Sequence, residues 1–199
     1  MDDVQTGAIL TRPADMFAEY SPRTARGREP TPAGLVVRPA RLEDSDAMAK
    51  IAWERNGGEL ADYAKRFVRD LSNHPRPPDE LWLTALLDGE VAGYGKAGVF
   101  TPPSDAPSNC APGGWYLFGV TVAPQFRRRG IARELTRARL AHIARLSDRA
   151  YYFANAQNRA SIDLHAQFGF TELTRDFHFP GTSFTGGVGI LFQVVLRAS

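Results

Sequence analysis

Apolar residues along this chain recur with two different spacings. Short runs rich in β-branched and aromatic residues, bounded by Gly, Pro, Asn or Asp, are typical of β-strands. Such runs occupy residues 35–38, 81–87, 91–100, 115–122, 150–154, 170–177 and 189–196. Asp88-Gly89, which separates the second run from the third, predicts a β-hairpin.

Other segments carry their apolar residues on one face at helical spacing. Tyr63, Phe67 and Leu71 recur every four residues, and a similar pattern starts at Ile131. These patterns predict helices at residues 42–55, 60–71, 131–146 and 159–168. Strands and helices that alternate in this way indicate an α/β fold.

The first 33 residues differ from the rest in composition. They contain Pro13, Pro22, Pro30 and Pro32, with few large apolar side chains. Such a segment buries too little surface to compensate for the entropy lost on ordering. We therefore expect residues 1–33 to be a flexible extension and residues 34–199 to form one domain, a size that can bury a substantial core.

Charge and cysteine content narrow the classes of partner. The 199 residues include 24 Lys and Arg against 22 Asp and Glu, and this net charge of +2 is too small to indicate a nucleic-acid partner. The single cysteine, Cys110, excludes an internal disulfide and a cysteine-based zinc site. No apolar run approaches the roughly 18 residues of a membrane span, and no secretion signal is visible. We expect a cytoplasmic protein without a metal.

The turn between the strand at 115–122 and the helix that begins at 131 contains the residues that best indicate a binding function. The strand at 115–122 ends before Pro124, which cannot donate to a sheet, and a helix begins after Arg127, Arg128, Arg129 and Gly130. N–H groups at a helix start lack partners and carry partial positive charge, so this turn is a candidate phosphate site. It lacks the residues of GxxxxGK[ST] and GxGxxG, which argues against a nucleoside triphosphate or a dinucleotide. The alternative is a solvated arginine turn.

The pattern V-x-V-x-P-x-x-R-x-x-G-x-A at residues 120–132 resembles the acetyl-CoA motif of the GNAT N-acetyltransferase superfamily, [Gln/Arg]-x-x-Gly-x-[Gly/Ala]. A second family element, N-x-x-S-x-x-L-H-x-x-x-G-F, follows at residues 158–170. The resemblance covers roughly Leu35 to Arg197. It implies an α/β fold with a mixed, mostly antiparallel central sheet that is flanked by helices and splayed at the strand carrying residues 115–122.

The resemblance also implies where acetyl-CoA binds. Its pyrophosphate would lie on the turn at residues 128–133, and its pantetheine arm would pair with the backbone at residues 120–122. The implied binding residues are Val120, Thr121, Val122, Arg127, Arg128, Arg129, Gly130, Ile131, Ala132, Arg133 and Asn158. For Asn158, helix capping is a second, compatible role.

The implied reaction is direct attack by a primary amine, which we expect to belong to a small molecule, through a tetrahedral intermediate that carries an oxyanion. A backbone N–H near Val122 is the expected oxyanion donor. His165 stands where many family members have Tyr and is a candidate general acid. The alternative is a packed helix residue, with water protonating a thiolate whose thiol has a pKa of ~8.5. Glu54, Glu59 and Asp62 on the early helices are candidates for the base or an amine anchor, with Glu59 taken as the base, and their alternative role is that of surface acids.

Other functions stay open at this stage. A chain that keeps the motif but lacks the Tyr could be a regulatory module that binds acyl-CoA without turnover. A protein N-acetyltransferase is a further alternative. A nucleic-acid-binding role for the arginine cluster would require a broad basic face and steeply salt-dependent binding. The sequence also leaves open a homodimer formed through the closing strands.

Overall fold

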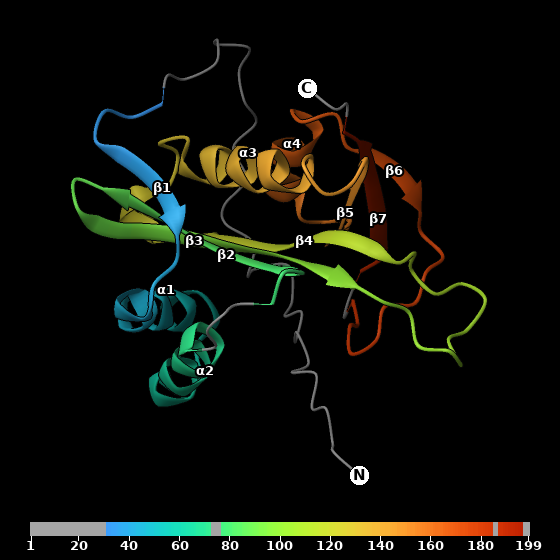
Figure 1. Ribbon diagram of the computed structural model, residues 1–199, viewed down its shortest axis with the longest axis horizontal. Coiled ribbons are helices and arrows are strands. Elements are labelled where there is room, and N and C mark those ends of the chain that lie inside the picture. The colour runs from blue at the N-terminus through green and yellow to red at the C-terminus, as the bar shows by residue number, and fades with distance from the viewer. Residues whose placement is uncertain (1–30, 73–76, 185–186, 197–199) are drawn as a thin grey trace.

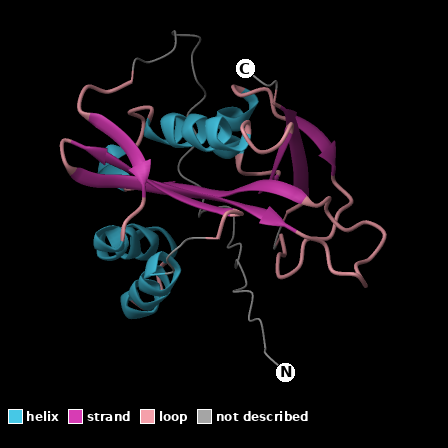
Figure 2. Ribbon diagram, viewed as in Figure 1, coloured by secondary structure: helices cyan, strands magenta, loops and turns pink. Residues whose placement is uncertain are grey.

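In the part of the chain that the structure describes, seven strands form one sheet, and helices cover both of its faces (Figure 1 and Figure 2). The structure is a computed structural model that describes residues 31–72, 77–184 and 187–196. The strands are β1 (Leu35–Pro39), β2 (Glu80–Leu87), β3 (Glu90–Phe100), β4 (Gly114–Val122), β5 (Arg149–Asn155), β6 (Thr171–Thr174) and β7 (Gly189–Val195). Their order across the sheet is β1-β2-β3-β4-β5-β7-β6.

The contact between β4 and β5 divides this sheet. All other neighbouring strands are antiparallel, whereas β4 and β5 are parallel and pair only at Tyr116 with Tyr151. Because a parallel pair needs a crossover, the helix that follows β4 lies on the sheet before the chain returns in β5. The two strands separate beyond this pair. This confirms the expected mixed sheet, splayed at the strand that carries residues 115–122.

Among the described residues, two α-helices lie on each face of the sheet. α1 (Ser45–Asn56) and α2 (Leu60–Ser72) cover one face, and α3 (Ile131–Ile143) and α4 (Arg159–Ala166) cover the other (Figure 1). Short 3-10 turns precede α1 and follow β4, at Leu42–Asp44 and Pro124–Phe126.

Some predicted elements are shorter in the structure. The helix predicted for residues 131–146 ends at Ile143, because the N–H of Leu146 turns back to the Ile143 carbonyl and its side chain is 56% exposed. The last helix likewise ends at Ala166, two residues early. The first closing strand stops at Thr174, whose hydroxyl accepts the N–H two residues further on and turns the chain.

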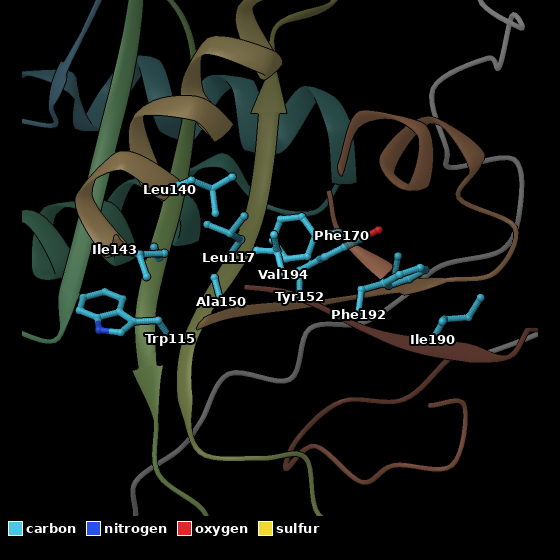
Figure 3. Packing of buried hydrophobic residues seen from close by; sticks show 12 residues of the cluster. Trp115, Leu117, Leu140, Ile143, Ala150, Tyr152, Phe170, Ile190, Phe192 and Val194 are labelled. Carbon is cyan, nitrogen blue, oxygen red and sulfur yellow. The ribbon is translucent and has the colours of Figure 1, made fainter. Parts of the chain in front are cut away.

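The core on the α3 side joins the two halves of the sheet. Trp115 and Leu117 of β4 pack with Tyr152 of β5, Phe192 of β7 and Ile143 of α3 (Figure 3). Burying one such large side chain is worth about 1.5–3 kcal/mol. This packing fixes α3 against β4 and β5 and thereby sets the position of the turn that connects β4 to α3.

The opposite core anchors α1 and α2. Phe67 of α2 is fully buried and meets the rings of Trp82 and Tyr94 edge to face, with centroids 5.6 and 5.2 Å away. Met48 and Ala52 of α1 complete this cluster. The end of α1 is thereby held over the sheet beside β4.

Candidate functional site

The turn between β4 and α3 has the open shape predicted for an anion site. Gly130 is the N-cap of α3 with φ of 76°, a left-handed conformation that costs other residues about 1–2 kcal/mol. A Cβ atom built here would have as its nearest neighbour Nη2 of Arg133, at 3.9 Å. The space that a side chain at Gly130 would fill is therefore open, beside the first N–H groups of α3, which have no partner within the helix.

One acidic residue lies in the first turn of α3, where it would oppose an anion. Glu134 is almost completely buried, and its carboxylate meets Arg137 at 2.7 Å, Arg133 at 3.4 Å and the hydroxyl of Thr31 at 3.2 Å. Burial raises the pKa of Glu134, but the hydrogen bond and charge of Arg137 outweigh it and leave the pKa below its usual value. Two arginines thus neutralise this carboxylate, and the helix start keeps its positive character.

The predicted arginine cluster surrounds the same turn. Arg129 lies over the ring of Phe126, 5.7 Å from its centroid, and Arg127 donates from Nε to the carbonyl of Val122 at 3.4 Å. Arg128 has φ of 65°, so this turn contains a left-handed residue other than glycine. All three side chains are exposed. The turn therefore combines a bare helix start with accessible cationic groups.

The last residues of β4 leave one backbone edge open. Ala123 donates to the Ala92 carbonyl of β3, and because antiparallel partners alternate, the polar groups of Val122 and Val120 point away from β3. Two arginines confirm the direction of these carbonyls. Arg127 donates to Val122, and Arg55 of α1 donates to Val120 at 3.4 Å and to the Thr121 hydroxyl at 2.9 Å. In the part of the chain that the structure describes, β5 has no pairing with this half of β4.

A β-bulge precedes this open edge. Gly95 pairs with Val120 and Lys96 with Phe118, so Gly119 is an extra residue on β4, with φ of 51°. Bulges bend a strand and redirect its polar groups, and they often occur next to active sites.

A fully buried arginine of α3 holds the bulge. Arg139 has 0% exposure and donates from Nη1 to the carbonyls of Lys96 and Gly119, at 2.9 Å each. Its Nε donates to Leu135 at 3.2 Å and its Nη2 to Thr136 at 3.1 Å. Burial lowers the pKa of Arg139 to about 9, which leaves it charged at neutral pH.

Sequence reasoning missed Arg139, although its spacing carried a signal. It follows Ile131 and Leu135 at intervals of four residues and therefore lies on the apolar face of α3. It also missed Arg55, an exposed residue near the end of α1 that nothing in the local sequence distinguishes.

Asn158 caps α4 after β5, on the far side of the splay from β4. Its side-chain oxygen accepts the N–H of Ser161 at 3.2 Å, which confirms the capping role. A contact between Asn158 and pantetheine stays a prediction.

His165 lies inside the aromatic core. It is 4% exposed, its ring stacks on Tyr152 with centroids 3.9 Å apart, and its Nδ1 is 2.8 Å from the carbonyl of Ser161. Burial lowers the pKa of His165 to about 3, despite the opposing hydrogen bond to Ser161, so the ring is neutral at pH 7. This environment supports the packing role considered for His165 and gives no support to the general-acid role.

Glu59 lies at the junction between α1 and α2 with an exposed side chain. Within residues 31–72, 77–184 and 187–196, no hydrogen bond or ion pair engages its carboxylate, so its role as a base stays a prediction.

In these same ranges no three His, Cys, Asp or Glu side chains are grouped as metal ligands, and no helix is long and apolar enough to cross a bilayer. Most of the predicted extension lies outside the described residues.

Comparisons with known proteins agree on the fold. The chain is similar to an N-acetyltransferase from Staphylococcus aureus Mu50, with a TM-score of 0.59 and 20% identity over 83% of this chain and 100% of that one. For the ribosomal-protein-S18-alanine N-acetyltransferase from Escherichia coli, the TM-score is 0.58 and the sequence identity 17%, over 83% of this chain and 96% of that one. For an acetyltransferase from Salmonella typhimurium, solved with its cofactor acetyl-CoA, the TM-score is 0.58 and the sequence identity 19%, over 83% of this chain and 96% of that one. A comparison of this sequence with curated proteins found no match.

The family comparison covers the functional turn. The model of the Acetyltransferase (GNAT) family matches residues 45–170, from the start of α1 to the residue before β6. This range includes the open edge of β4, the turn at Gly130 and the cap of α4 at Asn158. The chain therefore belongs to the GNAT family of acetyltransferases, which are acyltransferase enzymes.

Proposed function

We propose that this chain transfers the acetyl group of acetyl-CoA to a primary amine of a small molecule. One observation carries the proposal: the open edge of β4 at Val120 and Val122 runs through a single turn into the open N-terminus of α3 at Gly130. A donor with an amide-containing arm and a pyrophosphate fits both features, since a strand edge pairs with extended amides and a helix start binds phosphate.

The described side chains suit this ligand. Arg55 and Arg127 now donate to the carbonyls of Val120 and Val122, which the pantetheine amides would use. We therefore expect both guanidinium groups to release these carbonyls when acetyl-CoA binds. The cluster of Arg127, Arg128 and Arg129 remains beside the phosphate position, and Asn158 lies across the splay on the opposite side of the pantetheine arm.

The transfer itself needs few side chains. The amine nitrogen forms a bond to the thioester carbon, the C–S bond breaks, the nitrogen loses a proton and the thiolate gains one. Outward N–H groups of Val120 and Val122 are the candidate donors to the oxyanion. Because a thiol with a pKa of ~8.5 gives a good leaving group, we propose that water, rather than His165, protonates it. Glu59 or a water molecule takes the amine proton.

Two loops support a small acceptor. Ala111, in the loop after β3, donates to the carbonyl of His178, in the loop after β6, at 2.8 Å. Phe100 is the last residue of β3, and its ring lies 4.4 Å from that of Phe179 in the loop after β6. The ring of Phe179 lies 5.3 Å from that of Tyr116, a fully buried residue of β4. Because these contacts hold the two loops together at one end of β4, we propose a small amine rather than an extended peptide as the acceptor.

Calorimetric titration with acetyl-CoA, with ATP and NAD as controls, tests the donor. We expect binding of acetyl-CoA alone, and no binding would refute the proposed function. A panel of amines with detection of the released thiol then tests turnover, with the single protein thiol of Cys110 subtracted as background. Turnover only with N-terminal peptides would indicate a protein N-acetyltransferase, and binding without any turnover would indicate a regulatory module.

A further inference from the structure

Arg139 is unusual because its charge is buried without an acidic partner. All of its hydrogen bonds in the described part of the chain go to neutral groups: three backbone carbonyls and one hydroxyl. Burying an unpaired cation is expensive, and an apolar residue at this position on the inner face of α3 would avoid that cost. A stability role alone therefore explains this residue poorly.

The surrounding sequence makes room for the guanidinium group. Gly95 of β3 faces it, and a Cβ atom at this position would lie only 3.1 Å from its central carbon. Gly119 supplies the bulge whose carbonyl Arg139 binds. Two glycines on adjacent strands thus accommodate one charged side chain beside the open edge of β4.

The bond to Gly119 acts on the open edge through one peptide unit. The carbonyl of Gly119 and the N–H of Val120 belong to the same trans peptide, so they point in opposite directions. Arg139 occupies the carbonyl end, and the N–H end faces the splay. A cation at a carbonyl polarises the peptide and strengthens the hydrogen bond that its N–H donates.

We propose that Arg139 is a positioning residue of acetyl transfer, which fixes and polarises the Gly119–Val120 peptide so that the Val120 N–H donates to the thioester oxygen. This inference rests on the proposed function. It favours Val120 over Val122 as the oxyanion donor, because Arg139, a buried cation, binds the carbonyl of the peptide that carries the Val120 N–H. Preorganised donors of this kind stabilise developing charge without reorganising during the reaction.

Isotope-edited infrared spectroscopy of bound acetyl-CoA, labelled with ¹³C at the acetyl carbonyl, measures this polarisation directly. In the wild type we expect the carbonyl band below its frequency in free acetyl-CoA. In Arg139→Met the band should move back toward the free value, and kcat should fall about tenfold to a hundredfold, with a smaller change in acetyl-CoA affinity. Arg139→Lys, which keeps the charge but not the paired bonds, should be intermediate. Arg145→Met, an exposed change after the end of α3, is the matched control.

The outcomes separate the two proposals. No binding of acetyl-CoA to the wild type would refute the proposed function itself. Binding with the same carbonyl band in the wild type and in folded Arg139→Met would refute only the role of Arg139. If Arg139→Met does not fold, Arg139→Lys decides, since an unchanged band and kcat in that variant would overturn the inference.

Discussion

Replacing Gly130 with Glu puts a carboxylate where we propose that a phosphate binds. The substitution has two separate costs. A side chain in the left-handed conformation, at φ of 76°, costs about 1–2 kcal/mol of folding stability. The new charge also repels the pyrophosphate. Two unit charges about 4 Å apart interact by about 1 kcal/mol in water and by about 4 kcal/mol near a protein surface.

Gly130→Ala separates these costs. Its Cβ atom meets open space, with Nη2 of Arg133 at 3.9 Å, and the backbone strain is present in both the free and the bound state. We therefore expect Gly130→Ala to lower Tm by about 2–8 °C and to change acetyl-CoA affinity less than about threefold. Even with water-like screening, two phosphate charges should cost Gly130→Glu about 2 kcal/mol of binding, or roughly 30-fold.

Calorimetry on the wild type, Gly130→Ala and Gly130→Glu measures this difference. Gly89→Glu is the matched control, because Gly89 also has positive φ, at 87°, and no heavy atom near its Cβ position, but it lies in the turn between β2 and β3. We expect this control to bind like the wild type. Equal affinities for Gly130→Ala and Gly130→Glu would show that no phosphate binds at this helix start.

Three other substitutions test separate parts of the structure. The pKa of His165, lowered to about 3 in the folded protein against ~6.5 when unfolded, means that the unfolded state binds the extra proton as pH falls from 7 to 5. Between pH 7 and pH 5, His165 should therefore lower the unfolding free energy of the wild type by about 2 kcal/mol. Urea unfolding of His165→Gln should not show this decrease, and an equal pH dependence in both proteins would contradict the buried, neutral ring. Arg128→Gly removes a left-handed non-glycine residue at φ of 65°, so thermal unfolding should show a Tm higher by about 2–4 °C, and a lower Tm would mean that its side-chain contacts outweigh the strain. Arg55→Ala frees the Val120 carbonyl from a competing bond, so acetyl-CoA should bind a few times more tightly by calorimetry, whereas weaker binding would mean that Arg55 contacts the ligand.

The sequence predicted the order and type of the elements and the turn at Gly130 because these depend on local signals. Apolar periodicity, the Asp88-Gly89 turn and Pro124 act within a few residues of themselves. Helix and strand ends were less predictable. Leu146 continues the apolar spacing of α3 but is 56% exposed, because the core that would bury it ends with Ile143.

The parts of the site that were missed depend on contacts between distant segments. His165 and Tyr152 are 13 positions apart on different elements, so no local pattern reveals that their rings stack. Arg139 reads as one more arginine of a basic helix until β3 and β4 supply the carbonyls that it binds. Gly119 within a strand was the available signal for a bulge.

The open edge of β4 follows from how β5 is held. β5 pairs with β7 along its whole length, from Arg149 with Val195 to Asn155 with Gly189, whereas its backbone pairing with β4 is confined to Tyr116 with Tyr151. The second half of β4 therefore keeps unpaired polar groups, which in an ordinary sheet invite pairing with another chain. Here Arg55 and Arg127 satisfy its carbonyls and place positive charge along the edge. The carbonyls that the splay exposes thus have partners without a ligand, and we expect a ligand to exchange with the two arginines for them.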